Sequence, residues 1–141
     1  MKKNIGLVII THNETATALL KTTEMLCGVQ SNIEAINFYG DMDNVSLQEK
    51  CEKSIKNLNI EDGIIFLVDV FGGTPFNVAF MLSKKYKNSY IISGVNIPMI
   101  LEAYDLREED IPLNEKIDLI KKAAIEVILG QETSSQNLDD E

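Results

Sequence analysis

The sequence predicts an α/β domain built on a doubly wound, mainly parallel sheet of four strands, with helices on both faces. Residues 5–10 and 64–68 are apolar runs without the alternation of a half-exposed strand, which is typical of strands covered on both faces. Segments with helical periodicity alternate with the strands, and parallel strands require such crossovers. A chain of 141 residues suits one domain of this kind.

The first half of the chain contains two strand-helix units. Residues 5–10 form the first predicted strand, which ends at Thr11, His12 and Asn13. A helix follows over residues 16–27, with Gly28 placed to end it. Residues 33–39 form a shorter strand. In the second helix Ser46 and Glu49 have the spacing of a capping box, and the predicted buried side consists of Leu47, Cys51, Ile55 and Leu58.

The second half begins with the central strand, residues 64–68, which ends at Asp69 and a double glycine. Thr74 is a candidate cap and Pro75 suits the first position of the third helix, which is predicted to continue to about Tyr86. Its inward residues are expected to be Phe76, Ala79, Phe80 and Leu82.

Another strand is predicted over residues 89–93, and a short helix over residues 99–104. The last helix is expected to bury Ile117, Ile120, Ala124, Val127 and Ile128 and to stop at Gly130. We therefore expect one domain over residues 1–130. Residues 131–141 are polar and acidic, which predicts a flexible tail or the stump of a linker.

Composition excludes several classes of function. The formal charge of -9 argues against nucleic acid and anionic lipid, and favours partners with a basic docking face. Cys27 and Cys51 lack metal or redox spacing and are expected to be small buried hydrophobes. No segment has the length of a membrane span and no cleavage site follows the first strand, so we expect a cytoplasmic protein.

The candidate site combines His12 with Asp69, because ligands of doubly wound sheets bind at the carboxyl ends of the strands. A histidine beside a carboxylate can be a general base, a metal ligand or a nucleophile that takes a phosphoryl group. No Gly-x-Ser-x-Gly elbow accompanies it, and a second histidine for zinc is lacking. A nucleophilic imidazole held by Asp69 remains, with the amides of Gly72, Gly73 and Thr74 as a phosphoryl cradle. A packing histidine, a capping aspartate and a simple turn are the structural alternatives.

Four segments stand out together: the strand ending in Thr11-His12, residues 21–28 (KTTEMLCG), residues 66–77 (FLVDVFGGTPFN) and residues 94–99 (GVNIPM). In combination they resemble the enzyme IIA domain of the mannose-type (mannose/fructose/sorbose) sugar phosphotransferase system. The resemblance extends from about residue 5 to residue 130. It implies a phosphotransferase with a phosphohistidine intermediate and no metal or nucleotide cofactor.

In that family a histidine takes phosphate from the histidine-containing phosphocarrier protein and passes it to a IIB domain, for sugar uptake through membrane permease subunits. By position these roles map onto His12 as acceptor, Asp69 as orienting carboxylate and Thr74 as the hydroxyl residue after the double glycine. Family members are commonly homodimers, so a fifth edge strand exchanged between subunits is a further expectation. The resemblance does not identify the sugar.

Two positions depart from the family pattern. The first is Asn13, where the family usually has a glycine directly after the histidine. Asparagine tolerates a positive φ, but its side chain can alter the pocket or partner docking. Val70 replaces a residue that is often polar. Phe71 is predicted either to anchor a partner or to pack in the core.

Three alternatives remain open. The same chemistry occurs in the similar phosphotransfer subunit of dihydroxyacetone kinase, which differs in its recipient. Asn13 favours a regulatory binding module that has kept the fold and lost transfer. A flavodoxin-like cofactor binder is disfavoured, because the loop after the first strand lacks the Ser/Thr/Gly-rich character of a phosphate-binding loop.

Overall fold

The computed structural model describes residues 4–134 and confirms the predicted α/β class. The strands are β1 (Ile5–His12), β2 (Ile33–Phe38), β3 (Gly63–Val68) and β4 (Ser89–Ile92). The helices are α1 (Thr15–Cys27), α2 (Asn44–Ile55), α3 (Thr74–Ser83), α4 (Ile97–Leu106) and α5 (Leu113–Glu126). Strands and helices alternate up to the final helix pair, α4 and α5.

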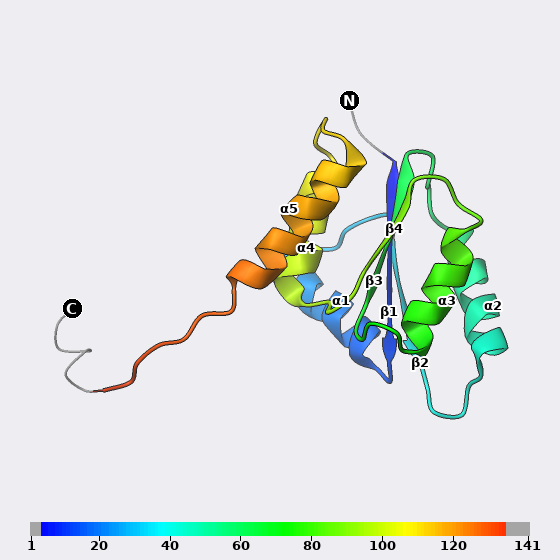
Figure 1. Ribbon diagram of the computed structural model, residues 1–141, viewed down its shortest axis with the longest axis horizontal. Helices are drawn as coiled ribbons and strands as arrows, with labels where there is room; N and C mark the ends of the chain where they lie inside the picture. The colour runs from blue at the N-terminus through cyan, green and yellow to red at the C-terminus, as the bar shows by residue number, and fades with distance from the viewer. Residues whose placement is uncertain (1–3, 135–141) are drawn as a thin grey trace.

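The four strands form one parallel sheet in the order β2-β1-β3-β4 (Figure 1). The chain moves from β1 outward to β2, then returns to the other side of β1 to form β3. The direction of winding therefore reverses between β1 and β3, and in such sheets the crevice at this point binds ligands. His12 ends β1 and Asp69 follows β3, so the topology brings the two predicted site residues to this crevice.

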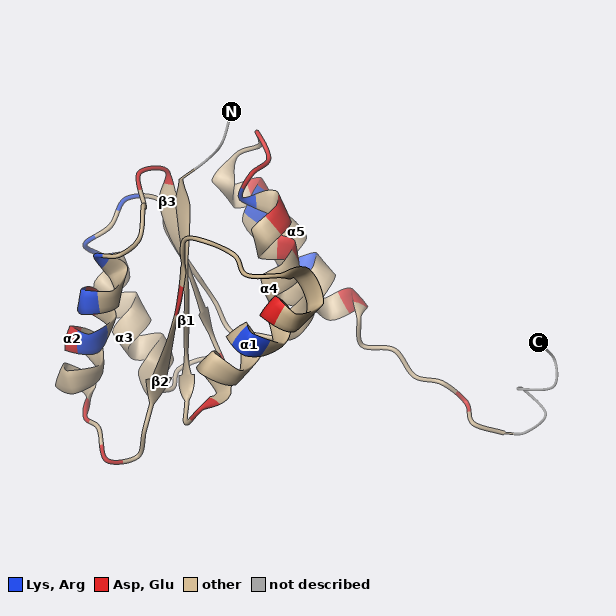
Figure 2. Cartoon of the chain, turned by 180° about the vertical axis from the view of Figure 1, so that it is seen from behind, with Lys and Arg blue, Asp and Glu red and all other residues tan. Residues whose placement is uncertain are grey.

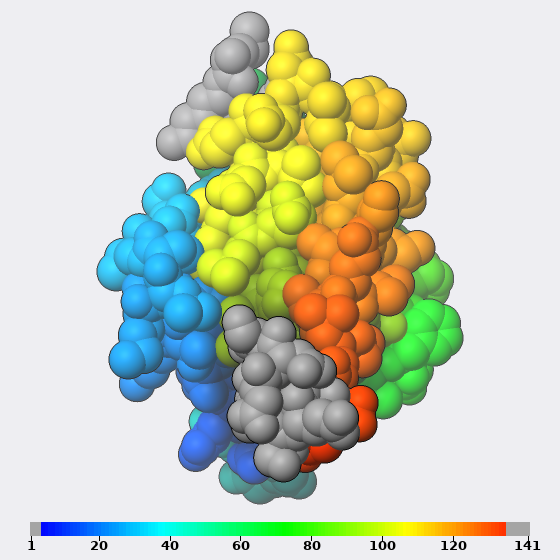
Figure 3. All heavy atoms as spheres, turned by 90° about the vertical axis from the view of Figure 1, so that its left-hand side faces the viewer, coloured from blue at the N-terminus to red at the C-terminus, as the bar shows by residue number. Residues whose placement is uncertain are grey.

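Helices cover both faces of the sheet, with α1, α4 and α5 on one face and α2 and α3 on the other (Figure 1). Figure 3 shows the first layer from outside, where α4 lies between α1 and α5. Alternate residues of β1 point to opposite layers: Leu7 and Ile9 pack under α4, while Val8 and Ile10 pack under α2 and α3. Because all four are fully buried, the strand is apolar without alternation.

The predicted N-cap of the second helix was wrong by three residues. Asp43 is the N-cap of α2: its Oδ1 accepts from the backbone N–H of Ser46 (2.8 Å), and Ser46 Oγ accepts from that of Asp43 (3.1 Å). This reciprocal pair is a capping box in which Ser46 takes the third helical position. In α3, Gly73 is the N-cap and Thr74 is the first helical residue, so Thr74 is not the cap.

Four residues that were predicted to be buried are exposed on α3, on α1 and beyond α5. Phe80 is half exposed, because α3 buries the stripe of Val78, Ala79 and Leu82, and Lys84 lies over the outer ring face. Cys27 is the exposed last residue of α1, whereas Cys51 is buried and burial raises the pKa of its thiol to about 12. Ile128 is 80% exposed, as α5 ends at Glu126 before the predicted stop at Gly130, and Val127 is exposed with it.

Within residues 4–134 the sheet has four strands, and the predicted exchanged fifth strand is not seen. Residues 127–134 follow α5 without regular structure, and the rest of the predicted tail, residues 135–141, lies outside the described residues. None of the helices in the described part of the chain is long and apolar enough to cross a membrane.

Candidate functional site

The His12 and Asp69 side chains meet at the carboxyl edge of the sheet, as predicted. β1 extends two residues beyond the apolar run, and its last residue, His12, pairs in register with Phe38 of β2. Asp69 is the first residue after β3 and belongs to the loop that leads to α3. Both residues are thus positioned by buried strands, while the His12 side chain is 46% exposed.

One oxygen of Asp69 accepts two hydrogen bonds from His12. Oδ2 lies 3.0 Å from the backbone nitrogen of His12 and 3.0 Å from Nδ1 of its ring. The other oxygen, Oδ1, accepts from the backbone N–H of Val70 (3.0 Å). Partial burial alone would raise the pKa of Asp69, but the backbone and ring hydrogen bonds and the charge of His12 together outweigh it and hold that pKa below its ordinary value.

This geometry determines which ring nitrogen is reactive. An ionised carboxylate only accepts hydrogen bonds, so Nδ1 of His12 carries the proton in its bond to Asp69. In the neutral ring Nε2 then has a lone pair and no proton. The Phe38 ring packs against the imidazole in a T-shaped contact, with ring centroids 5.9 Å apart, and restricts its rotation. The site therefore holds Nε2 in a fixed orientation at the exposed edge of the sheet.

Gly73 lies directly against the reactive side of the ring. A Cβ at this position would be 3.1 Å from Cε1 of His12 and 3.7 Å from Nε2, so any larger residue would push the imidazole from its place. Its backbone N–H donates to the carbonyl of Val70 (3.3 Å) and is already used within the turn. Among the described residues, the N–H groups of Gly72 and Thr74 have no such acceptor. Thr74 opens α3, so its amide is one of those at the positive end of the helix dipole.

Asn13 and Phe71 both lie exposed beside this pair. Asn13 has φ +57°, as expected where the family usually has glycine, and its backbone N–H donates to the carbonyl of Phe38 (2.7 Å). Phe71 is 75% exposed and packs only one side against Phe76, at a centroid distance of 4.5 Å. The interpretation of Phe71 as a core aromatic was therefore wrong.

Sequence reasoning missed three residues that support the site. Phe38 orients the ring, and the available signal was its place at the end of a strand that reaches the same edge. The backbone N–H groups of Gly94 and Val95 donate to the carbonyls of Asp69 (3.1 Å) and Val68 (3.0 Å). These bonds connect the loop after β4 to the start of the loop that contains Asp69. Because they join backbone groups only, the side-chain pattern of the sequence does not predict them.

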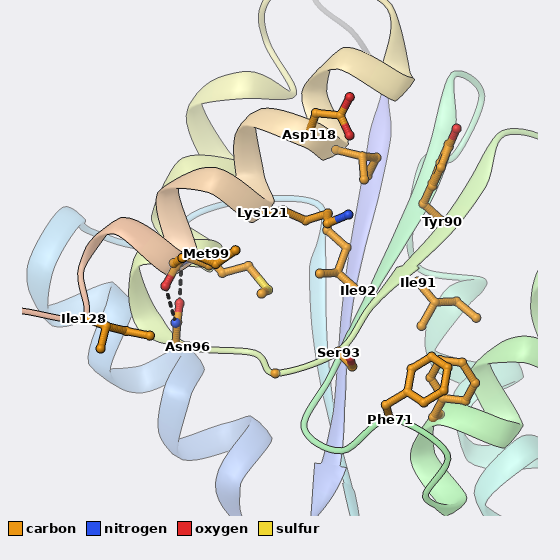
Figure 4. A pocket seen from close by; sticks show the side chains of 15 residues that line it. Phe71, Tyr90, Ile91, Ile92, Ser93, Asn96, Met99, Asp118, Lys121 and Ile128 are labelled. Carbon is orange, nitrogen blue, oxygen red and sulfur yellow. Dashed lines mark hydrogen bonds between the residues drawn. The ribbon is translucent and has the colours of Figure 1, made fainter.

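An apolar groove runs from Phe71 along the open side of β4 toward α5 (Figure 4). It has a volume of about 560 Å³. Tyr90 and Ile92 lie on the β4 side, and Lys121 and Ile128 lie on the side of α5 and the segment that follows it (Figure 4). At one end Asn96 caps α4 by accepting from the N–H of Met99 (2.9 Å), and it also donates to the carbonyl of Ala124 (3.0 Å).

The site residues do not form a metal centre. Over residues 4–134 no group of three or more His, Cys, Asp or Glu side chains is arranged to hold an ion. Asp69 is hydrogen-bonded to His12 through Oδ2 and to Val70 through Oδ1, so its acceptor positions are directed at protein donors. The arrangement suits reaction at a nitrogen atom.

Residues 6–121 match the family model described as the PTS system fructose IIA component, where PTS denotes the sugar phosphotransferase system. The chain belongs to this family. It is 39% identical over 115 residues to the mannose-specific EIIAB component of Escherichia coli K12, covering 82% of this chain and 36% of that protein. It is also 35% identical over 104 residues to the fructose-specific EIIA component of Bacillus subtilis, covering 74% of this chain and 71% of the relative.

Solved structures agree with the PTS IIA assignment. The EIIA component from Streptococcus agalactiae superposes with a TM-score of 0.80 at 26% identity, covering 89% of this chain and 96% of that one. The mannose/sorbose-specific IIA subunit from Enterococcus faecalis has the same fold, with a TM-score of 0.77 at 22% identity, covering 96% and 98%. The chain spans about a third of the length of the mannose-specific relatives, which carry EIIA and EIIB in one protein.

Proposed function

We propose that this chain is a phosphocarrier, in which His12 accepts a phosphoryl group from the histidine-containing phosphocarrier protein and passes it to a IIB domain for sugar uptake. The observation that carries the proposal is the 3.0 Å contact between Nδ1 of His12 and Oδ2 of Asp69. It leaves Nε2 as the nucleophile at an exposed edge that a second protein can reach. Membership of the PTS IIA family supports this chemistry.

In the transfer step the lone pair of Nε2 attacks the phosphorus atom of the donor phosphohistidine. A new N–P bond forms as the N–P bond of the donor breaks, and the donor ring leaves as neutral imidazole. The His12 ring gains a positive charge, which the carboxylate of Asp69 stabilises while Nδ1 keeps its proton. The amides of Gly72 and Thr74 are the proposed donors to the phosphoryl oxygens. The N–H of Gly73 already donates to the carbonyl of Val70, so we propose that Gly73 serves instead by leaving space beside the His12 ring.

The charges around the site suit a basic partner. Acidic residues occupy the loop between β2 and α2 and the start of α1, close to the carboxyl edge (Figure 2). They include Glu14, Asp41 and Asp43, all exposed. Phe71 and Asn13 supply the uncharged part of the proposed docking surface, where an exposed aromatic ring can anchor a partner. Both the upstream phosphocarrier and the IIB domain would use this edge in turn.

We further propose that a second copy of the chain covers the groove beside β4. β4 pairs only with β3 in the described residues, so its outer edge has unpaired backbone groups. Apolar residues are exposed on and after the end of α5, with Ile128 at 80% and Leu129 at 86%. Such residues are the expected contacts of a homodimer, and sedimentation of the wild type against Ile128→Asp tests the assembly.

Phosphate incorporation from phosphoenolpyruvate, with the two general upstream proteins of the system, tests the phosphocarrier function. Wild type, His12→Ala and the surface control Glu49→Gln, on the exposed side of α2, should be compared, with acid lability scored. We expect acid-labile label on wild type and on Glu49→Gln, and none on His12→Ala. An unlabelled wild type, with the upstream proteins active and the spectrum of a folded domain, would contradict the proposal and favour the regulatory binding module.

A second stage identifies the recipient. Labelled chain is mixed with a mannose-type IIB domain or with the remaining subunits of a dihydroxyacetone kinase. Loss of label to the IIB domain supports the sugar transport function, which the curated relatives favour because they are mannose-, fructose- and sorbose-specific PTS components. Transfer only to the kinase subunits would instead assign the chain to that system.

A further inference from the structure

Arg107 is a buried cation far from the site described above. It follows the last residue of α4, at the amino edge of the sheet, and only 5% of it is exposed. The eight residues of β1 separate this edge from His12, which corresponds to roughly 25 Å of strand. Arginine is almost never buried to this extent unless a carboxylate or another charged group pairs with it.

The contacts of Arg107 do not compensate its charge. Nη1 donates to the backbone carbonyl of Asn32 (3.2 Å), and the guanidinium carbon lies 5.3 Å from the centroid of the Tyr104 ring. Over residues 4–134 no carboxylate forms an ion pair with it. Burial lowers the pKa of Arg107, and the negative charge of the neighbouring Glu108 opposes this shift only in part. A guanidinium has five N–H donors, and one carbonyl uses only one of them.

Arg107 lines a polar cavity of about 280 Å³. Its other guanidinium nitrogens donate to no described residue. Ser31, Asn57 and Asn59 also line the cavity and carry further donor groups. The Nδ2 groups of these two asparagines donate to no described residue, and the exposed carboxylate of Glu108 also borders the cavity.

We propose that this cavity binds a small oxyanion, a phosphate or a carboxylate, through the guanidinium of Arg107. The planar fork of arginine matches such ions with two parallel hydrogen bonds, and the amides and the hydroxyl complete the donor set. The volume lies at the lower limit of ligand pockets and so admits a ligand of few atoms. The site is independent of His12 and would give the domain a second anion-binding position at the opposite edge of the sheet.

Titration of the ¹⁵N-labelled chain with inorganic phosphate, at constant ionic strength, tests the proposal through its backbone amide signals. The amides of Ser31 and Asn57 should shift and saturate in wild type and equally in His12→Ala. Arg107→Lys keeps the charge and loses the fork, so its affinity should fall by about tenfold or more. Asn57→Ala removes a side chain with no described structural contact and should weaken binding about threefold. Asn114→Ala, on the surface of α5, is the matched control and should bind as wild type.

A parallel titration with acetate separates the two ligand classes. Saturation by either ion supports the site, and the tighter ion identifies the class. The proposal is overturned if phosphate and acetate shift only the amides near Gly72 and Thr74, if the shifts at Ser31 and Asn57 rise without saturating, or if Asn57→Ala and folded Arg107→Lys bind as wild type.

Discussion

At both ends of β1 a backbone N–H donates to an aspartate carboxylate, but the two aspartates differ in their other contacts. At the amino end the backbone N–H of Asn4 donates to Oδ2 of Asp62 (2.7 Å); at the carboxyl end that of His12 donates to Oδ2 of Asp69 (3.0 Å). The two aspartates flank β3 on either side. At the amino end the N–H of Asp62 returns a bond to the carbonyl of Asn4 (2.9 Å), whereas Asp69 takes the His12 ring instead. Both aspartates therefore hold an end of β1 through a backbone N–H, and Asp69 additionally contacts the side chain of the candidate site residue His12.

Two asparagines extend the contrast between the ends. Asn32 and Asn13 have nearly the same backbone conformation, with φ of +61° and +57°. The side chain of Asn32 donates to the carbonyls of Ile5 (2.9 Å) and Asn59 (2.8 Å) and accepts from the N–H of Asn59 (2.7 Å). Asn13 has no side-chain hydrogen bond to any described residue. Asn32 at the amino edge thus uses its side chain to join loops, whereas the side chain of Asn13 at the carboxyl edge stays available.

The largest effect that we expect from this contrast is on stability. Asn32→Gly keeps the positive φ and removes three hydrogen bonds that join loops, so the free energy of unfolding should fall by about 2–3 kcal/mol. Asn13→Gly removes no such bond and should change it by less than about 0.5 kcal/mol. Urea denaturation followed by circular dichroism measures both. Equal losses of unfolding free energy in Asn32→Gly and Asn13→Gly would show that the side-chain hydrogen bonds of Asn32 do not distinguish the two edges.

The next effect concerns the two aspartates. Asp69→Asn keeps a hydrogen-bond acceptor for His12 but removes the negative charge that stabilises the phosphorylated ring, so phosphoryl transfer should slow by about 10–100-fold. Asp62→Asn should leave the transfer rate unchanged, because Asp62 pins the far end of the strand. Rapid-quench measurement of label on each variant compares the rates. A slow Asp62→Asn would show that pinning, rather than charge, controls transfer.

Two neighbouring glycines give a sharper test at the carboxyl edge. Gly73 has an extended backbone (φ -77°, ψ 177°) that alanine adopts freely, yet its new Cβ would lie 3.1 Å from Cε1 of His12. Gly73→Ala should therefore slow transfer by about tenfold with little loss of stability. Gly72 has φ +83° and open space around it, so Gly72→Ala should cost about 1 kcal/mol in stability with transfer largely retained. Slower transfer in Gly72→Ala than in Gly73→Ala would contradict the contact between Gly73 and the His12 ring.

The smallest effect is a pH dependence. The folded-state pKa of Asp69 lies below its ordinary value of 3.8, so its ionised form stabilises the fold. This contribution is fully present above pH 3.8 and disappears as the pH falls through the folded-state pKa. The difference in unfolding free energy between wild type and Asp69→Asn should shrink as the pH falls below 3.8, by less than about 1 kcal/mol. A difference that grows on acidification would contradict the assignment.

The fold class and the His12–Asp69 pair could be predicted from the sequence because both follow from local signals. Unbroken apolar runs identified the buried strands, and the residues after those runs had to share one edge of the sheet. The positive φ at Asn13 agrees with the glycine that the family usually has at this position, because asparagine tolerates that conformation.

The remaining errors concern choices between competing local partners or contacts across the sheet. Asp43 and Ser46 were both plausible caps, and only geometry shows which one accepts the helix amide. Phe80 fits the helical period of α3, but the buried stripe is too narrow to include it. Phe38 packs on His12 through strand register, and Arg107 borders a cavity formed by loops remote in sequence. Periodicity carries no information about such contacts.

The shared oxygen of Asp69 has a spectroscopic consequence. Because Oδ2 accepts from both the backbone N–H and the ring of His12, any change in the ring alters the hydrogen bond of that single backbone amide. The amide proton of His12 is thereby a built-in reporter, whose resonance follows the state of the imidazole without a probe on the side chain. If His12 is phosphorylated as proposed, the two forms should give two peaks for this amide in a ¹H–¹⁵N spectrum, and the relative intensities of these peaks report their proportions.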